Sequence, residues 1–184
     1  IGQGIAHLLR CFYKKNIEIV IATNSYTHKK MLSYKIVDHI IYKKDLFSES
    51  QKILRTDIRS VLNNKILEKG YDKIFECSGS VDIFNIILRL TNKNANVVLT
   101  GMNMKNTKLD PTPIWHRNIK IHGAHGYKLR YPKIRLDTFS YLANLMLKGK
   151  INLDRLKIKK INFRDWKNLF KDNDYGSLKK TLIF

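Results

Sequence analysis

The chain has 184 residues, of which 43% are hydrophobic, enough for one domain of ordinary size and a further segment. No apolar run reaches the ~18–20 residues that span a bilayer, and Cys11 and Cys77 form neither a disulfide framework nor a metal-binding Cys pair, so we expect a cytoplasmic protein without membrane contact. The net charge of +20 comes from lysines dispersed from Lys14 to Lys180, which indicates a solvated basic surface suited to an anionic cofactor or a phosphorylated substrate, and no nucleic-acid partner.

The chain opens on a glycine-rich turn that runs into a helix. Gly2-Gln3-Gly4 precedes an apolar run that includes Leu8 and Leu9. Such a turn lets backbone N–H groups and a helix N-terminus meet a pyrophosphate. No Met precedes it, and the strand expected before the first glycine is reduced to Ile1. We therefore expect the chain to be a piece of a larger protein.

Strands and helices alternate along the first two thirds of the chain. The β-branched and apolar runs that predict buried strands are 17–22, 38–42, 72–77, 96–100 and 119–122. The segments whose spacing predicts helices are 27–35, 48–69, 81–90 and 136–147. A loop with Pro111 and Pro113 lies between the last two strands. This alternation predicts an α/β fold with a doubly wound parallel sheet covered by helices on both faces.

The rhythm breaks after Gly149. A strand is expected over 156–163, a short helix over 164–170 and a closing strand over 181–184. We therefore expect a boundary near residue 150, with one domain over 1–150 and a separate segment over 151–184.

Five segments occur in the order and at the spacing of a known family. They are Gly2-Gln3-Gly4, Val37-Asp38-His39-Ile40-Ile41, Tyr71-Asp72-Lys73-Ile74-Phe75-Glu76-Cys77-Ser78-Gly79, Val97-Val98-Leu99-Thr100-Gly101 and Ile119-Lys120-Ile121-His122-Gly123. The tail adds Gly149-Lys150-Ile151-Asn152-Leu153 and Lys180-Thr181-Leu182-Ile183. In these features the chain resembles the C-terminal half of medium-chain dehydrogenases/reductases, nearest the zinc-type alcohol and polyol dehydrogenase branch.

The resemblance implies a Rossmann-type NAD(P)-binding domain over 1–150, with its first strand truncated. It implies that 151–184 returns to complete a GroES-like catalytic domain. The family keeps its catalytic zinc ligands in an N-terminal portion that this chain does not include. We expect no catalytic or metal-binding residue here, since the six histidines form no ligand cluster with cysteine.

The resemblance implies an oxidoreductase that transfers hydride between a nicotinamide cofactor and an alcohol or carbonyl substrate. The piece alone is expected to be inactive. Two alternatives stay open: a zinc-free quinone-reductase-like enzyme, and a non-catalytic nucleotide-binding module. The sequence does not identify the substrate.

The first cofactor-binding residues belong to the glycine turn. Gly2 and Gly4 would form the tight turn and allow close approach of phosphate, and Ile5 follows them on the helix. His7 stands where the fingerprint has a third glycine, which normally allows tight helix–strand packing. We expect its imidazole to push the helix outward or to point aside, or else to contact phosphate.

The end of the strand expected over 17–22 bears on the choice between NADP and NAD. An NAD site usually offers an acid to the ribose 2′-hydroxyl there, but the sequence has Thr23 and Asn24, with Lys29 shortly after. Hydroxyl, amide and cationic groups suit a 2′-phosphate. We therefore expect NADP to bind at least as well as NAD, unless Lys29 belongs only to the general lysine excess.

Three further places are expected to face the cofactor. Cys77 and Ser78 end one strand, and Gly101 and Met102 end the next, at the carboxyl edge where ligands bind in such sheets. Cys77 is interpreted as a small lining residue, because no base partners its thiol. By the resemblance, Lys180 lies where the family has a cation able to reach the pyrophosphate.

The strand Ile119–His122 is expected at a sheet edge. In the family this strand pairs with its twin across a two-fold axis, and an unpaired edge invites such pairing. We therefore expect a homodimer, or a tetramer of such dimers. Trp115 would anchor the interface or, alternatively, cap its own domain core.

Overall fold

The computed structural model describes the chain except for residues 25–35, 103–107, 125–137, 153–157, 168–178 and 184. The expected helix over 27–35 and the position of Lys29 therefore lie outside the described residues. The chain divides into two units, one of Ile1–Gly4 with Lys44–Tyr127 and one of Ile5–Lys43 with Lys128–Phe184. The expected boundary near residue 150 stays a prediction.

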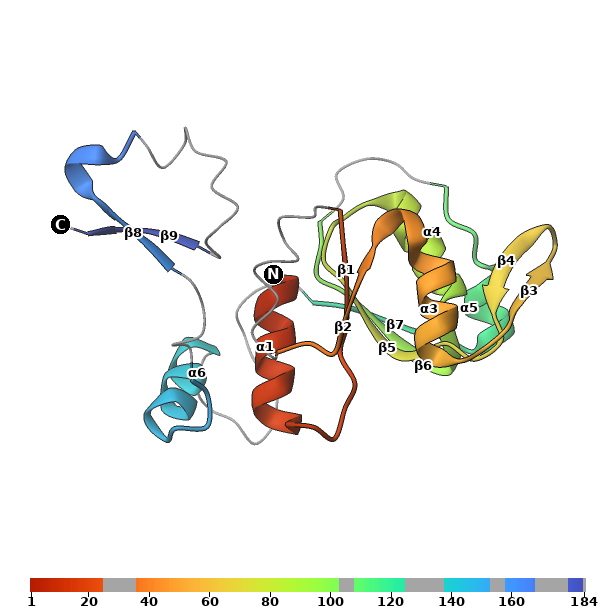
Figure 1. Ribbon diagram of the computed structural model, residues 1–184, viewed down its shortest axis with the longest axis horizontal. Coiled ribbons are helices and arrows are strands. Elements are labelled where there is room, and N and C mark those ends of the chain that lie inside the picture. The colour runs from red at the N-terminus through yellow and green to blue at the C-terminus, as the bar shows by residue number, and fades with distance from the viewer. Residues whose placement is uncertain (25–35, 103–107, 125–137, 153–157, 168–178, 184) are drawn as a thin grey trace. The chain divides into compact units, whose positions relative to one another are not determined.

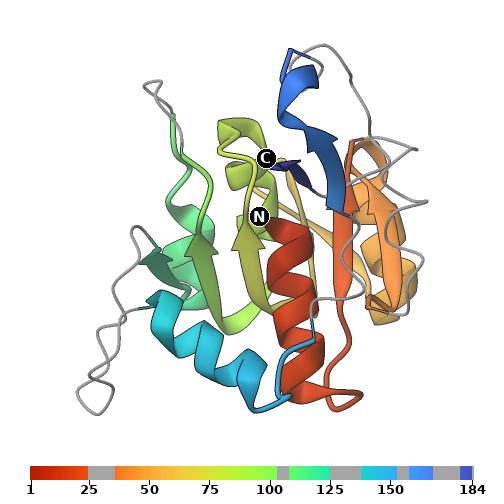
Figure 2. The ribbon, with the colours of Figure 1, turned by 90° about the vertical axis from the view of Figure 1, so that its left-hand side faces the viewer.

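The first unit is built on a parallel sheet of three strands, β5 (Tyr71–Glu76), β6 (Thr91–Leu99) and β7 (Lys120–Gly123), in the order β5-β6-β7. The register places Val97 opposite both Ile74 and Ile121. Figure 2 shows β5 and β6 side by side and pointing the same way. Their carboxyl ends therefore meet at one edge of the sheet, as expected from the sequence.

Helix α4 (Val81–Arg89) covers this sheet because its apolar residues recur at helical spacing. Ile87 and Leu88 form a buried cluster with Val97 of β6 and Ile119, and Ile83 and Phe84 pack against it. The strand β6 and helix α4 are thus fixed to one another by a continuous apolar core. That core determines where the loops at the carboxyl ends of β5 and β6 begin.

The expected helix over 48–69 is wrong. Helix α3 (Leu46–Leu54) follows the 3₁₀ turn η1 (Lys43–Asp45) and ends at Arg55, whose φ of 48° is left-handed. The chain then forms an antiparallel hairpin of β3 (Ile58–Val61) and β4 (Asn64–Leu67). Its two turn residues, Leu62 and Asn63, have φ of 49° and 62°, as a type I′ turn requires.

The proline-containing segment before β7 is a short helix, α5 (Thr112–Arg117), and not only a loop. Proline is tolerated there because the first turn of a helix has N–H groups without partners. Arg117 at its end is buried and donates to the carbonyls of Thr91 and Leu67, which ties the hairpin to β6. Burial lowers the pKa of the Arg117 guanidinium.

Helix α1 (Gly2–Tyr13) belongs to the second unit from Ile5 onward. There it packs on the parallel pair β1 (Val20–Thr23) and β2 (His39–Tyr42). Ala6 of α1 forms a buried cluster with Ile19 and Ile36, next to the two strands. Arg10 fastens the end of the helix through bonds to Ile36 O and to Asp38, which also accepts from Ile19 N at 2.7 Å. Burial raises the pKa of Asp38, but the hydrogen bonds from Ile19 and Arg10 outweigh burial and hold it below its ordinary value.

The rest of this unit contains helix α6 (Thr138–Leu147) and the parallel pair β8 (Ile158–Asn162) and β9 (Lys179–Ile183). The 3₁₀ turn η2 (Phe163–Asp165) follows β8, where a short helix over 164–170 was expected. Helix α6 and the strands β8 and β9 are labelled in Figure 1. Strands are thus present in the described parts of the ranges 156–163 and 181–184.

Candidate functional site

The candidate site lies at the carboxyl ends of β5 and β6. Backbone bonds join the two ends, because the carbonyl of Glu76 accepts from Thr100 N at 2.8 Å and from Gly101 N at 2.9 Å. The Thr100 hydroxyl donates to the same carbonyl at 2.8 Å. The segments Cys77–Ser80 and Thr100–Met102, here termed the β5 loop and the β6 loop, are therefore held side by side.

The N-terminus of α1 adjoins the β5 loop. A β-carbon built on Gly2 would lie 3.6 Å from Cys77 Sγ, so a methyl group added at Gly2 would be in van der Waals contact with the thiol. Thr100 Oγ1 lies 3.2 Å from the same sulfur. Cys77 thus fills the space between the first glycine and the β6 loop, which fits the interpretation of a small lining residue.

The first turn of α1 is suited to an anion. The first N–H groups of a helix have no partner within it, and the helix dipole places partial positive charge there. The turn carries no acidic side chain. Among the described residues other than its two chain neighbours, no atom outside the helix backbone comes within 4 Å of a β-carbon placed on Gly4. A pyrophosphate fits the chemistry of these donors.

The glycines of the two loops are required by their close approach. Gly79 has a φ of +67°, and a β-carbon there would overlap the backbone of Met102. A β-carbon on Gly101 would overlap Gly79 N and would lie 2.7 Å from Glu76 Oε2. Gly101 and Met102 of the β6 loop therefore lie against the β5 loop. Ser78 of the β5 loop is exposed.

The other expected cofactor residues are placed as follows. Ile5 is half-buried on α1, and Thr23 is buried at the end of β1, followed by the exposed Asn24. Lys180 lies in β9, opposite Lys159 in the register. The structure brings Gly2, Cys77, Ser78, Gly101 and Met102 together; the roles of all the expected residues stay predictions.

His7 points aside, as one of the sequence expectations allowed. The ring is only 4% exposed, and its Nε2 lies 2.5 Å from the backbone oxygen of Asn152. Cys11 Sγ is 3.7 Å from the same nitrogen. The imidazole is thus hydrogen-bonded to the backbone of the segment that follows residue 150.

Sequence reasoning did not single out Glu76. Its side chain is 5% exposed, although it is an acid. The signal was available, because a carboxylate that follows the apolar pair Ile74-Phe75 and directly precedes Cys-Ser-Gly needs partners if it is buried.

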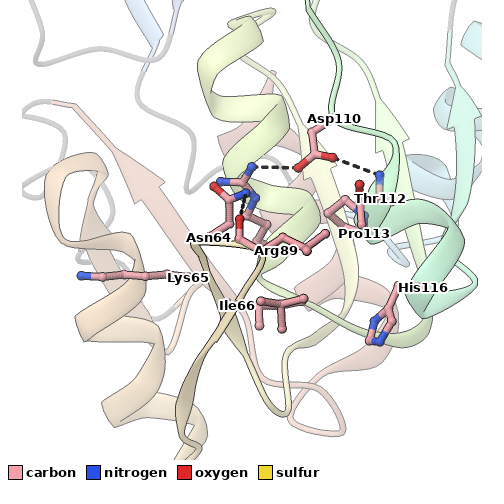
Figure 3. A pocket seen from close by; sticks show the side chains of 10 residues that line it. Asn64, Lys65, Ile66, Arg89, Asp110, Thr112, Pro113 and His116 are labelled. Atoms are coloured by element: carbon pink, nitrogen blue, oxygen red, sulfur yellow. Dashed lines mark hydrogen bonds and ion pairs between the residues drawn. The ribbon is translucent and has the colours of Figure 1, made fainter.

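A separate pocket of about 200 Å³ lies between the hairpin β3–β4 and helix α5 (Figure 3). Arg89 and Asp110 pair across it at 2.9 Å, and Asp110 also accepts from Thr112 N at 3.1 Å. These bonds hold the pKa of Asp110 below its ordinary value. None of the expected cofactor residues that the structure describes lines this pocket.

Two features concern metals and membranes. In the part of the chain that the structure describes, no group of three or more His, Cys, Asp or Glu side chains could hold a metal ion. None of the described helices has the length and apolar character needed to cross a bilayer.

The fold and this sheet edge define a protein with a dinucleotide-binding type of α/β domain. The model of the zinc-binding dehydrogenase family matches residues 16–143, more than half of the chain. The chain belongs to the zinc-binding dehydrogenase family.

Individual relatives agree with this assignment. The chain is 27% identical over 131 residues to D-arabitol-phosphate dehydrogenase of Enterococcus avium, covering 71% of this chain and 35% of that protein. A solved short chain alcohol dehydrogenase of E. coli CFT073, complexed with NADH, shares the fold with a TM-score of 0.70 and 18% identity. The match covers 98% of this chain and 48% of that one.

A solved zinc-binding dehydrogenase of Sinorhizobium meliloti 1021, described as putative and bound to NADP, has a TM-score of 0.63 and 17% identity, over 91% of this chain and 45% of that one. The chain therefore spans between about a third and a half of the length of these relatives.

Proposed function

We propose that the intact protein is an NAD(P)-dependent oxidoreductase that transfers hydride between a nicotinamide cofactor and an alcohol or carbonyl substrate. The observation that carries the proposal is that Gly2, at the N-terminus of α1, lies next to Cys77 at the carboxyl end of β5. This arrangement puts a helix N-terminus beside the β5 and β6 loops, which would face the nicotinamide ring of the cofactor. The assignment to the zinc-binding dehydrogenase family supports it.

In this proposal the residues of the chain bind and orient the cofactor, and the bound dinucleotide accepts or gives the hydride. The N–H groups at the start of α1 bind the pyrophosphate, since they carry partial positive charge and Gly4 adds no bulk. The β5 and β6 loops fix the position of the nicotinamide half. Lys180 would add a cation for the pyrophosphate.

The metal of the proposed enzyme is zinc, held by residues outside this chain. The described residues do not offer a ligand set, so no step is assigned to zinc in this chain. By the same reasoning the chain alone would be inactive. Zinc ligands elsewhere in the intact protein would separate this proposal from a quinone-reductase-like enzyme, and failure to bind either cofactor would favour a non-catalytic module. The cytoplasmic location stays a prediction.

We infer that NADPH binds at least as well as NADH. Thr23 and Asn24 provide no carboxylate that would repel a 2′-phosphate, and Lys29 follows in the sequence. Fluorescence titration of the intact protein with both dinucleotides tests this. Lys29→Glu should weaken NADPH about tenfold, equivalent to about 1.4 kcal/mol, with little effect on NADH.

Lys15→Glu is the matched control, because it makes the same charge change at an exposed position after α1. It should leave both affinities unchanged. A clear preference of the wild-type protein for NADH would contradict the inference about cofactor choice, while leaving the oxidoreductase proposal intact.

We also propose a homodimer, or a tetramer of such dimers, formed through β7. Among the described strands β7 pairs only with β6, so its other edge carries unpaired backbone groups. Trp115 is 82% exposed, which favours the interface role over the alternative of a core cap. A large exposed aromatic residue near a sheet edge is typical of interface anchors.

A further inference from the structure

The carboxylate of Glu76 accepts hydrogen bonds from Ser78 and Gly79 of the β5 loop. Its Oε1 accepts from Ser78 N at 2.7 Å, from the Ser78 hydroxyl at 2.5 Å and from Gly79 N at 3.1 Å. Its Oε2 accepts from Gly79 N at 3.0 Å. Both oxygens of the buried side chain therefore accept hydrogen bonds.

The same residue holds the β6 loop through its main chain. The carbonyl of Glu76 accepts from Thr100 N, Gly101 N and the Thr100 hydroxyl, each within 2.9 Å. On the side-chain face, Gly101 lies so close that a β-carbon there would be 2.7 Å from Oε2. Main chain and side chain of one residue therefore bind two different loops.

The carboxylate also occupies N–H groups that could otherwise bind a ligand anion. The N–H groups of Ser78 and Gly79 lie just before α4, where consecutive N–H groups form a site for a negative charge. An internal carboxylate fills that site. The N-terminus of α1 is then left as the place for the pyrophosphate.

We propose that Glu76 is a positioning residue for the cofactor: it sets the spacing of the β5 and β6 loops and keeps the N–H groups before α4 occupied. The inference rests on the proposed dinucleotide binding. It assigns Glu76 no contact with the reacting atoms; the residue acts through Cys77, Ser78 and Gly101.

The test uses Glu76→Gln in the intact protein. Glutamine keeps the shape but replaces one acceptor oxygen by an NH₂ group, which would face the N–H of Gly79 or Ser78. The expected result is an approximately tenfold rise in Kd for both NADH and NADPH, because the loops face the part that the two cofactors share. Glu68→Gln is the control, since Glu68 is exposed and paired with Arg59 on the hairpin; it should change neither Kd.

A second readout does not depend on the cofactor. In a Cys11→Ser background, a thiol reagent should modify Cys77 several-fold faster when Glu76 is Gln, because the loop around the sulfur is released. A purely structural role would lower the melting temperature but leave both Kd values of the folded protein and the labelling rate unchanged; that result overturns the inference.

If Glu76→Gln does not fold, Ser78→Ala decides the question. It removes the hydroxyl donor from the carboxylate and should raise both Kd values about threefold; unchanged values overturn the inference. A wild-type protein that binds neither dinucleotide refutes the proposed function, and the inference with it. A wild-type protein that binds, beside a Glu76→Gln variant of equal affinity, refutes only the inference.

Discussion

The same substitution, glycine to alanine, should have opposite effects on stability at two positions of the candidate site. At Gly101 a β-carbon would overlap Gly79 N and approach Glu76 Oε2 to 2.7 Å, below the 3.4 Å at which ordinary contact begins. Both obstacles are held by hydrogen bonds, so the β5 and β6 loops must separate.

Separation weakens the bond from Gly101 N to the Glu76 carbonyl and that from Gly79 N to the Glu76 carboxylate. Each lost bond costs about 1 kcal/mol, and each donor left unsatisfied about 1–3 kcal/mol. We therefore expect Gly101→Ala to lower the free energy of unfolding by about 2–4 kcal/mol.

At Gly4 the sign reverses. Apart from its chain neighbours, no described residue places an atom beyond the helix backbone within 4 Å of the added β-carbon. Glycine within a helix is about 0.5–1 kcal/mol less favourable than alanine. Gly4→Ala should therefore raise the free energy of unfolding by up to about 1 kcal/mol. The same methyl group stands where the pyrophosphate would approach α1, so cofactor affinity should fall about tenfold.

Urea unfolding of the intact protein, followed by circular dichroism, measures both stabilities from the midpoint at constant m value. Fluorescence titration with NADPH measures the affinities. A neutral Gly101→Ala variant would refute the packing argument for the two loops. A Gly4→Ala variant that is more stable and binds NADPH as tightly as the wild type would refute the placement of the pyrophosphate at α1.

Two further predictions concern pH and assembly. Hydrogen bonds from the Arg89 side chain, and then from Thr112, lower the pKa of Asp110 below its ordinary value of 3.8. Ionised Asp110 therefore stabilises the fold above pH 3.8, and this contribution is lost as the pH falls through the lower pKa of the folded state. Asp110→Asn should therefore flatten the fall of melting temperature from about pH 5 to about pH 2, and an unchanged slope would argue against it. Ile121→Pro removes a donor from β7 and should shift the assembly to monomer in sedimentation; a folded variant that keeps the wild-type mass would place the interface elsewhere.

The parallel strands could be predicted because their side chains report burial directly. Runs such as Ile74-Phe75 and Val97-Val98 are apolar without alternation, as strands covered on both faces require. The glycine turn, with Gly2 and Gly4, likewise indicated the start of α1. These signals are local, so they are present in the sequence itself.

The hairpin could not be predicted by periodicity. Ile58, Ile66 and Leu67 match a helical spacing, yet they lie on the two short strands β3 and β4. The left-handed conformations of Arg55, Leu62 and Asn63 decide the outcome, and only Asn63 is a residue type that favours this region. Leucine and arginine at positive φ give no compositional warning.

Glu76 was missed for a different reason. Hydrophobic patterning assigns a charged residue to the surface, whereas the partners of Glu76 are mostly backbone N–H groups. Backbone donors are the same in every sequence, so their arrangement around a carboxylate becomes visible only in the folded chain.

The bond between His7 and the backbone of Asn152 has a consequence for recombining this domain with that of a relative. A side chain of the glycine turn's own helix is bonded to the chain beyond residue 150, so a crossover placed at that boundary would pair His7 with a foreign backbone path. Since the acceptor is a main-chain carbonyl, the identity of residue 152 matters less than the course of the chain there. A chimera that keeps the native sequence through Asn152 retains this bond. A chimera that places His7 in a relative with glycine at this position would bury the imidazole without this acceptor.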